Sequence, residues 1–255
     1  MKRFLSVAAA LVAFALPVQA QEEKIVAGLS QNAVQITATF VGSEILIFGA
    51  VKRDAPAPVG DLGVAVVVEG PSSPITVRRK SKVMGIWVNS DAVEVEAAPS
   101  FYAIATSAPF DEIISPDLNR ARDISIPESI RILESDAVAD TESFAEAVIR
   151  IRSNAGLYMI NEGAVDMSEE TLFNTRIELP SNLTEGDYRA RIYLTRGGEL
   201  VAEHSANIDV RKVGLERWLY NLAHEQSLLY GLMSLAIAIA AGWGASAFFR
   251  VFFRS

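Results

Sequence analysis

The chain has 255 residues, a net charge of −8 and no cysteine. The absence of cysteine excludes disulfides, iron–sulfur clusters, thiolate metal sites and cysteine nucleophiles. Four of the 23 basic residues lie in the two apolar ends, so the segment between them carries 19 basic against 31 acidic residues, a net charge of −12. Such a segment repels phosphate backbones, which argues against a nucleic-acid partner.

The N-terminus predicts a secretory signal peptide over residues 1–20. Lys2 and Arg3 precede the uncharged run 4–16, and residues 17–20 end in small side chains where a signal peptidase cleaves. That run of 13 residues is shorter than the ~20 apolar residues that a membrane-spanning helix needs. We therefore expect cleavage after Ala20 rather than a retained N-terminal anchor.

The C-terminus predicts one transmembrane helix over residues 226–249. These 24 residues contain no charge, and as a helix they span about 36 Å, which exceeds the ~30 Å hydrocarbon core of a bilayer. Because the signal peptide commits the N-terminus to export, the body (21–213) is expected outside the cytoplasm. The tail (250–255) is then expected inside it.

An amphipathic juxtamembrane segment is predicted over residues 214–225. Leu215, Trp218, Leu219 and Leu222 recur with helical spacing, and Tyr230 can also sit at headgroup level. This membrane-interface set should hold the body close to the bilayer.

Within the predicted span, small residues recur at every fourth position: Ala238, Gly242 and Ser246. Such a face lets two transmembrane helices approach closely, so it is a candidate helix–helix face. The partner helix would belong to another membrane protein or to a second copy of the chain.

Between the two ends, alternation of apolar and polar residues is the main signal. Residues 34–40 and 187–194 alternate with a period of two, which is typical of half-buried strands. Residues 45–51 and 64–68 are nearly continuous apolar runs, the pattern of strands covered on both faces or central in a sandwich. Further strands are expected at 75–79, 86–88, 92–97, 101–106, 172–179 and 206–212.

The strand spacing, punctuated by proline and glycine, predicts a mainly β fold made of one or two immunoglobulin-like antiparallel sandwiches. Residues 196–199 predict a tight hairpin turn, because Gly197 and Gly198 can adopt positive φ. Tyr188 follows a glycine turn. This is the place of the corner tyrosine of immunoglobulin-like domains, although core packing explains it equally well.

A helical insertion is predicted at about 110–156. Ser115–Pro116 and Pro127 are placed as helix starts, and Asp140 or Thr141 can cap a helix that ends near Gly156. The insertion either crosses one end of a single body or joins two sub-domains, 21–108 and 157–213. Both alternatives stay open.

No sequence motif points to catalysis or a cofactor. The two histidines, His204 and His224, are isolated, and a zinc site needs three or four convergent ligands. The acids at 134, 136, 140, 142 and 146 lack the spacing of a calcium loop and suit the start of a helix. We therefore expect a protein that is not an enzyme and has no cofactor and no metal.

One basic cluster stands out in the acidic body: Arg78, Arg79, Lys80 and Lys82, with Trp87 on the next strand. Alternation places Arg79 on the inward face, where it requires a partner. One interpretation pairs the cluster with Glu94 and Glu96 across the sheet. The other makes it a patch that binds an anion or a protein partner.

Several stretches together resemble an alphaproteobacterial family of transmembrane proteins of unknown function. They are EILIFGAV (44–51), VRRKSKVMGIWVN (77–89), PSFYAIATSAP (99–109), FAEAVIRIRSNAGLY (144–158), LFNTRIELPSNLTEGDYRARIYL (172–194) and LLYGLMSLAIAIAAGWGASAFFR (228–250). The resemblance implies a periplasmic β-rich domain, a C-terminal transmembrane helix and a single-pass place in the bacterial inner membrane. It carries over no catalytic residue.

The family is associated with sulfite-exporter-type permeases, so the resemblance also implies an accessory role beside a permease. The leading functional hypothesis is thus a membrane-tethered periplasmic interaction or accessory module. A small-anion-binding protein is the alternative, and a hydrolase of unknown specificity is the third.

Overall fold

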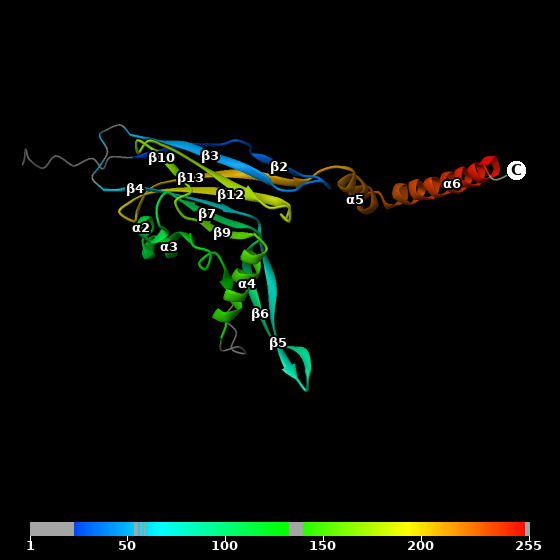
Figure 1. Cartoon of the computed structure of the whole chain (residues 1–255), viewed down its shortest axis with the longest axis horizontal. Coiled ribbons are helices and arrows are strands. Elements are labelled where there is room, and N and C mark those ends of the chain that lie inside the picture. Colours follow the sequence, from blue (N-terminus) through cyan, green and yellow to red (C-terminus); the bar gives the residue numbers. More distant parts are fainter. Residues whose placement is uncertain (1–22, 54–55, 57, 59, 133–139, 253–255) are drawn as a thin grey trace, which may run out of the picture.

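The structure is a computed structural model that describes residues 23–53, 56, 58, 60–132 and 140–252. The predicted signal peptide, the acids Glu134 and Asp136 and the last residues of the tail lie outside the described residues. The described chain forms a β-rich body, a hairpin that projects from it and two consecutive C-terminal helices (Figure 1).

Two sheets make up the body. The four-stranded sheet has the order β1 (Lys24–Leu29), β3 (Ser43–Lys52), β11 (Leu172–Leu179), β10 (Asp166–Ser168). The six-stranded sheet has the order β2 (Ala33–Ile36), β13 (Glu199–Lys212), β12 (Gly186–Arg196), β4 (Leu62–Glu69), β7 (Tyr102–Thr106), β9 (Tyr158–Asn161). All pairings are antiparallel except β13 with β2 and β7 with β9. The two stretches left open as sub-domains, 21–108 and 157–213, contribute strands to both sheets.

A third, three-stranded sheet consists of β5 (Ser72–Val83), β6 (Ile86–Pro99) and the short β8 (Arg131–Ile132). The helices of the insertion are α2 (Phe110–Ile113), α3 (Pro116–Arg122) and α4 (Glu142–Asn154). The C-terminal helices are α5 (Leu215–Glu225) and α6 (Ser227–Phe252). The mainly β class, the helical insertion and the C-terminal apolar helix are therefore confirmed.

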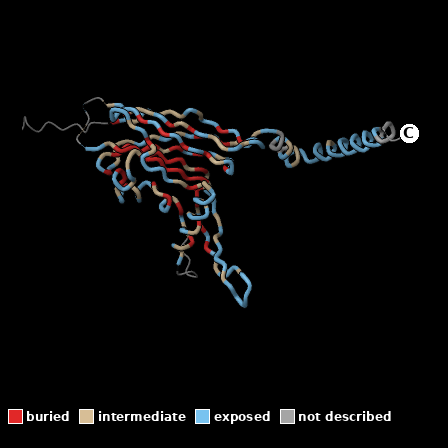
Figure 2. The backbone as a smooth tube through the Cα atoms, viewed as in Figure 1, coloured by how far each residue is buried: buried red, intermediate tan, exposed pale blue. Residues whose placement is uncertain are grey.

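Two hydrophobic cores lie on opposite faces of the six-stranded sheet. In β4, Val64, Val66 and Val68 face the four-stranded sheet, while Ala65 and Val67 face the insertion helices and the base of β5 and β6. All five are fully buried, so the prediction that 64–68 is covered on both faces is confirmed. Figure 2 shows the buried residues gathered in this part of the body.

The other continuous apolar run, 45–51, is covered on one face. Ile45 and Ile47 are buried in β3, whereas Phe48 is exposed. β3 belongs to the outer four-stranded sheet, whose second face has no layer over it among the described residues. Composition alone could not distinguish an outer strand from a central one.

Two further expectations on local structure are corrected. The strand predicted at 34–40 ends at Ile36, because the chain turns where Phe40 donates its N–H to the carbonyl of Thr37 (3.0 Å). Pro127 lies in a turn rather than at a helix start. Ser115, by contrast, caps α3, since its side chain accepts a hydrogen bond from the N–H of Leu118 (3.3 Å).

The hairpin turn at 196–199 is confirmed: Gly197 and Gly198 have φ of +58° and +85° between β12 and β13. Tyr188 is buried, and its hydroxyl donates to the carbonyl of Thr184 four residues upstream (2.8 Å). This bond has the form of a tyrosine corner, and the ring packs in the first core as well.

A projecting hairpin as candidate functional site

β5 and β6 form one long hairpin, which we call the arm (residues 72–99). It leaves the body between β4 and β7, two neighbours in the six-stranded sheet, and extends well beyond them (Figure 1). The arm base (72–79 and 91–99) packs against the body, and the arm tip (80–90) does not. The basic cluster lies at the boundary between the arm base and the arm tip.

The arm base is held by apolar burial. Val93 and Val95 of β6 are buried; Val95 belongs to the second core, and Ile75 and Val77 of β5 pack against that core. This core also contains Val148 of α4. The insertion helices therefore support the inner half of the arm.

Arg79 ties the arm to the start of α4. Its guanidinium lies 3.1 Å from the carboxylate of Asp140, donates to the hydroxyl of Ser143 and stacks 4.5 Å from the ring centroid of Phe144. Hydrogen bonds from Ser143 and Arg79 lower the pKa of Asp140. Arg79 thus lies on the core-side face, as alternation predicted, but its partner is Asp140 and not Glu94 or Glu96.

A bulge separates base from tip. Arg79 lies opposite Asp91, but Lys80 lies opposite Asn89, so Ser90 is an extra residue in β6. Beyond the bulge, Lys82 lies opposite Trp87 and Val83 lies opposite Ile86, and Met84 and Gly85 close the turn. Directly opposed residues of antiparallel strands share a face, so Lys80, Lys82 and Trp87 lie on one face.

The tip is apolar and unprotected. The exposed fractions are 48% for Val83, 100% for Met84, 65% for Ile86 and 68% for Trp87. A two-stranded ribbon without a covering layer is marginal in water. Soluble surfaces seldom gather apolar side chains in this way unless the patch binds something.

The candidate patch therefore divides. Lys80, Lys82 and Trp87 lie at the tip, and Arg78 lies on the same face of β5 just before the bulge, whereas Arg79 is engaged with α4. A cavity of about 460 Å³ runs along the arm base, but Glu94, Glu96 and their neighbours line it and none of the basic residues does. Sequence reasoning found Trp87 but missed Val83, Met84 and Ile86, although their place at the hairpin turn is the signal that would have found them.

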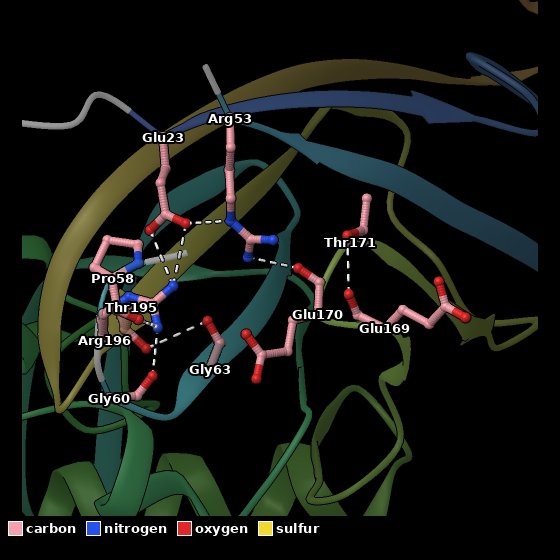
Figure 3. A network of polar contacts seen from close by, with 10 residues as sticks. All are labelled: Glu23, Arg53, Pro58, Gly60, Gly63, Glu169, Glu170, Thr171, Thr195 and Arg196. Carbon is pink, nitrogen blue, oxygen red and sulfur yellow. Dashed lines mark hydrogen bonds and ion pairs between the residues drawn. The ribbon is translucent and has the colours of Figure 1, made fainter. Parts of the chain in front are cut away.

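The rest of the body is tied by buried ion pairs with a structural role. Glu23 accepts hydrogen bonds from Arg53 (2.5 Å) and from Arg196 (3.1 and 3.2 Å), and its side chain is 3% exposed (Figure 3). Arg53 also donates to the carbonyl of Glu170 (2.6 Å), and Arg196 to that of Pro58 (3.1 Å). Arg53 follows β3 and Arg196 ends β12, so this network joins the two sheets.

A second polar cluster lies on the face of the six-stranded sheet that also carries the second core. Arg191 lies 3.1 Å from Glu69 and donates to the hydroxyl of Tyr102 (3.0 Å), which in turn bonds the carbonyl of Ile124 (2.9 Å). Burial raises the pKa of Tyr102, and it raises the pKa of Tyr193 to about 12. Both phenols stay protonated at neutral pH, so neither is poised as a general base.

Metal ligands do not converge in the described part of the chain, where no group of three His, Asp or Glu side chains could hold an ion. His204 lies in β13, and His224 stacks on Tyr220 in α5, with ring centroids 4.0 Å apart. Asp140 contacts Arg79 and Ser143, and Glu142 lies in the first turn of α4.

The membrane-interface residues lie on the two C-terminal helices. Trp218, Leu219 and Leu222 are on α5, and Tyr230 is in the first turns of α6; the side chain of Leu215 is outside the described part. α5 meets α6 at Gln226, and Gly214, with φ of +119°, joins α5 to β13.

α6 is long and apolar enough to cross a membrane over Ser227–Ser246, and none of that window is buried. Its 26 residues span about 39 Å. Ala238, Gly242 and Ser246 are all exposed on it, and nothing lies within 4 Å of a Cβ placed at Gly242. Whether another helix packs there stays a prediction.

A family model described as "Putative transmembrane protein (Alph_Pro_TM)" matches residues 24–251. The chain belongs to this family. The match covers the body, the arm and both C-terminal helices. Together with the apolar α6, it identifies a membrane protein whose described residues contain a single candidate span. A search of curated proteins found no match.

Proposed function

We propose that this member of the family is a non-enzymatic, membrane-tethered interaction module that acts beside an integral membrane protein. The observation that carries the proposal is the arm, a supported hairpin whose tip presents four apolar side chains to solvent. Proteins seldom maintain such a tip on a braced base without a partner for it. The proposed site therefore lies on a protrusion rather than in a cavity.

The proposal also includes the location. The body would lie in the periplasm, α6 would cross the inner membrane and the tail would be cytoplasmic. The signal peptide predicted at 1–20 supports this orientation. The immunoglobulin-like character of the body is part of the same proposal, supported by the core shared between two sheets and by the Tyr188 corner.

A permease is the partner class that the family resemblance favours, with the sulfite-exporter type as the candidate. Direct binding of a small anion by the basic cluster has less support. Arg79 is engaged with Asp140, and Arg78, Lys80 and Lys82 are spread along an exposed ribbon instead of converging. Anion sites gather several donors around one point.

The test is purification of the full chain from native membranes in a mild detergent. We expect a stoichiometric integral membrane protein to co-purify with the parent chain and to be lost in the double variant Met84→Ser/Trp87→Ser. Leu172→Ser is the matched control, because Leu172 is an exposed apolar residue on the body. Recovery of the parent chain alone would contradict the proposal, and so would equal loss in the control.

A further inference from the structure

We propose that the arm tip is a plug that enters an apolar recess with an acidic rim on the extramembrane surface of a neighbouring membrane protein. This inference rests on the proposed function and adds the chemistry of the partner. The tip is convex and small, with Val83, Met84, Ile86 and Trp87 surrounding one two-residue turn. A convex apolar knob is complementary to a recess rather than to a flat surface.

The basic charge of the arm indicates that the rim of the recess is acidic. Residues 71–90 contain four basic side chains and no acidic one, in a body that is otherwise acidic. Arg78, Lys80 and Lys82 follow one another along one face of β5, immediately behind the apolar tip. A recess that receives the tip therefore meets these cations at its edge, where carboxylates would match them.

The backbone at the turn shows that the apolar side chain is costly to place there. Met84 has φ of +48°, in the left-handed region, and Gly85 has φ of +89°. Two-residue turns of this kind favour asparagine or aspartate followed by glycine. Methionine gains nothing locally from the position, yet its flexible side chain adapts well to an irregular apolar site. A binding role accounts for a fully exposed methionine at this position.

The direction of the arm favours a protein over the lipid bilayer. Figure 1 shows the arm extending sideways from the body, across the direction in which α6 leaves it. With α6 along the membrane normal, the arm runs beside the membrane instead of into it. A neighbour in the same membrane, with a domain at the height of the body, is then within reach.

The body of a second copy is a poorer match. Its hollow of about 840 Å³, next to the arm base, includes Glu69, Asp187 and Asp209 in its lining. These acids already have cationic partners: Glu69 lies 3.1 Å from Arg191, and Arg211 lies 2.8 Å from Asp187 and 2.6 Å from Asp209. They are therefore largely neutralised and offer little to the arm.

A spin label tests the inference, because the chain has no cysteine and a single engineered one can be labelled specifically. Asn89→Cys places the label beside Trp87 without removing an apolar anchor, and Ser168→Cys on β10 is the control position. The full chain is studied in native membranes and in lipid-only nanodiscs. Accessibility to oxygen reports lipid, and accessibility to a water-soluble nickel chelate reports solvent.

We expect the Asn89→Cys label to be immobilised and shielded from both reagents in native membranes, and mobile and nickel-accessible in nanodiscs. Adding Lys80→Glu/Lys82→Glu should reduce the shielded fraction at least about threefold, since like charges would then meet across the rim. Arg120→Glu/Arg150→Glu makes the same change of charge on α3 and α4 and should leave it unchanged.

The other outcomes separate the two proposals. If the shielded fraction is unchanged by the charge reversal, the acidic rim is contradicted, whereas the proposed interaction module is not. Oxygen accessibility in nanodiscs would identify lipid as the occupant, and spin–spin broadening there would identify a second copy; either overturns the inference. A label that stays mobile and nickel-accessible in native membranes would overturn the proposed function itself.

Discussion

β4 and the arm tip both carry branched apolar side chains, yet these side chains lie in opposite environments. Val64–Val68 of β4 is buried on both faces between two cores, whereas Val83 of β5 and Ile86 across from it are exposed. The body gains its stability from burial and from buried ion pairs. The arm tip contributes little to stability, so its apolar side chains are available for binding.

The largest expected effect comes from removing the buried carboxylate of Glu23, which joins the two sheets of the body. Glu23→Ala leaves Arg196, whose side chain is 10% exposed, and Arg53 without their carboxylate. Removing one partner of a buried pair costs about 3–5 kcal/mol of unfolding free energy. Glu44→Ala is the control, because Glu44 and Arg176 form an exposed pair (3.4 Å) that contributes at most about 1 kcal/mol. Denaturant unfolding of the full chain in detergent measures both, and equal losses would count against the network.

A smaller difference in unfolding free energy is expected between substitutions in the arm base and in the arm tip. Val95→Ala in the buried base should cost about 2 kcal/mol, because it removes two methyl groups and leaves a cavity. Ile86→Ala at the exposed tip should change unfolding by less than about 0.5 kcal/mol. The same unfolding measurement compares them. A large loss from Ile86→Ala would mean that the tip is buried in the free protein.

A substitution in the turn is expected to stabilise the arm tip rather than destabilise it. Met84→Asn places a residue suited to the left-handed region at φ of +48°, so the tip should gain about 0.5–1 kcal/mol. Amide hydrogen exchange in the hairpin should then slow by about two- to fivefold. The same variant should weaken partner binding, since it removes an exposed apolar anchor. Faster exchange would show that methionine is not strained there.

The smallest effect concerns the tie between the arm and α4. The pKa of Asp140 is lowered by hydrogen bonds from Ser143 and Arg79, so its contribution is complete above the unfolded pKa of about 3.9. It is lost as the pH falls through the lower folded value. Exchange of the arm-base amides should therefore be protected equally at pH 7 and pH 5 and less below pH 4. Asp140→Asn should remove this acid-dependent step, and an unchanged step would assign it to another carboxyl group.

Local patterns predicted much of this architecture. The strand predicted at 172–179 matches β11, and the alternation of apolar and polar residues predicted β12. The two adjacent glycines predicted the turn at Gly197–Gly198, and a run without charges predicted α6. The two apolar runs at 45–51 and 64–68 look alike, but only the second is central. The difference depends on which strands pack above and below, which no local pattern contains.

The candidate site shows the same division. The basic cluster and Trp87 were visible in the sequence, as was the placement of Arg79 on the inward face. The partner of Arg79 was not, because Asp140 lies 61 residues away and reaches it only through the packing of α4 on the arm. The exposure of the arm tip was not predicted, because it depends on how far the supporting helices extend along the arm.

The sequence by itself determined that the chain is β-rich and acidic and ends in an apolar helix long enough to span a membrane, because periodicity, charge and hydropathy are local properties. Only the tertiary structure decided that β5 and β6 form one hairpin, that its base is braced and that its tip stands free. Those features depend on contacts between distant segments.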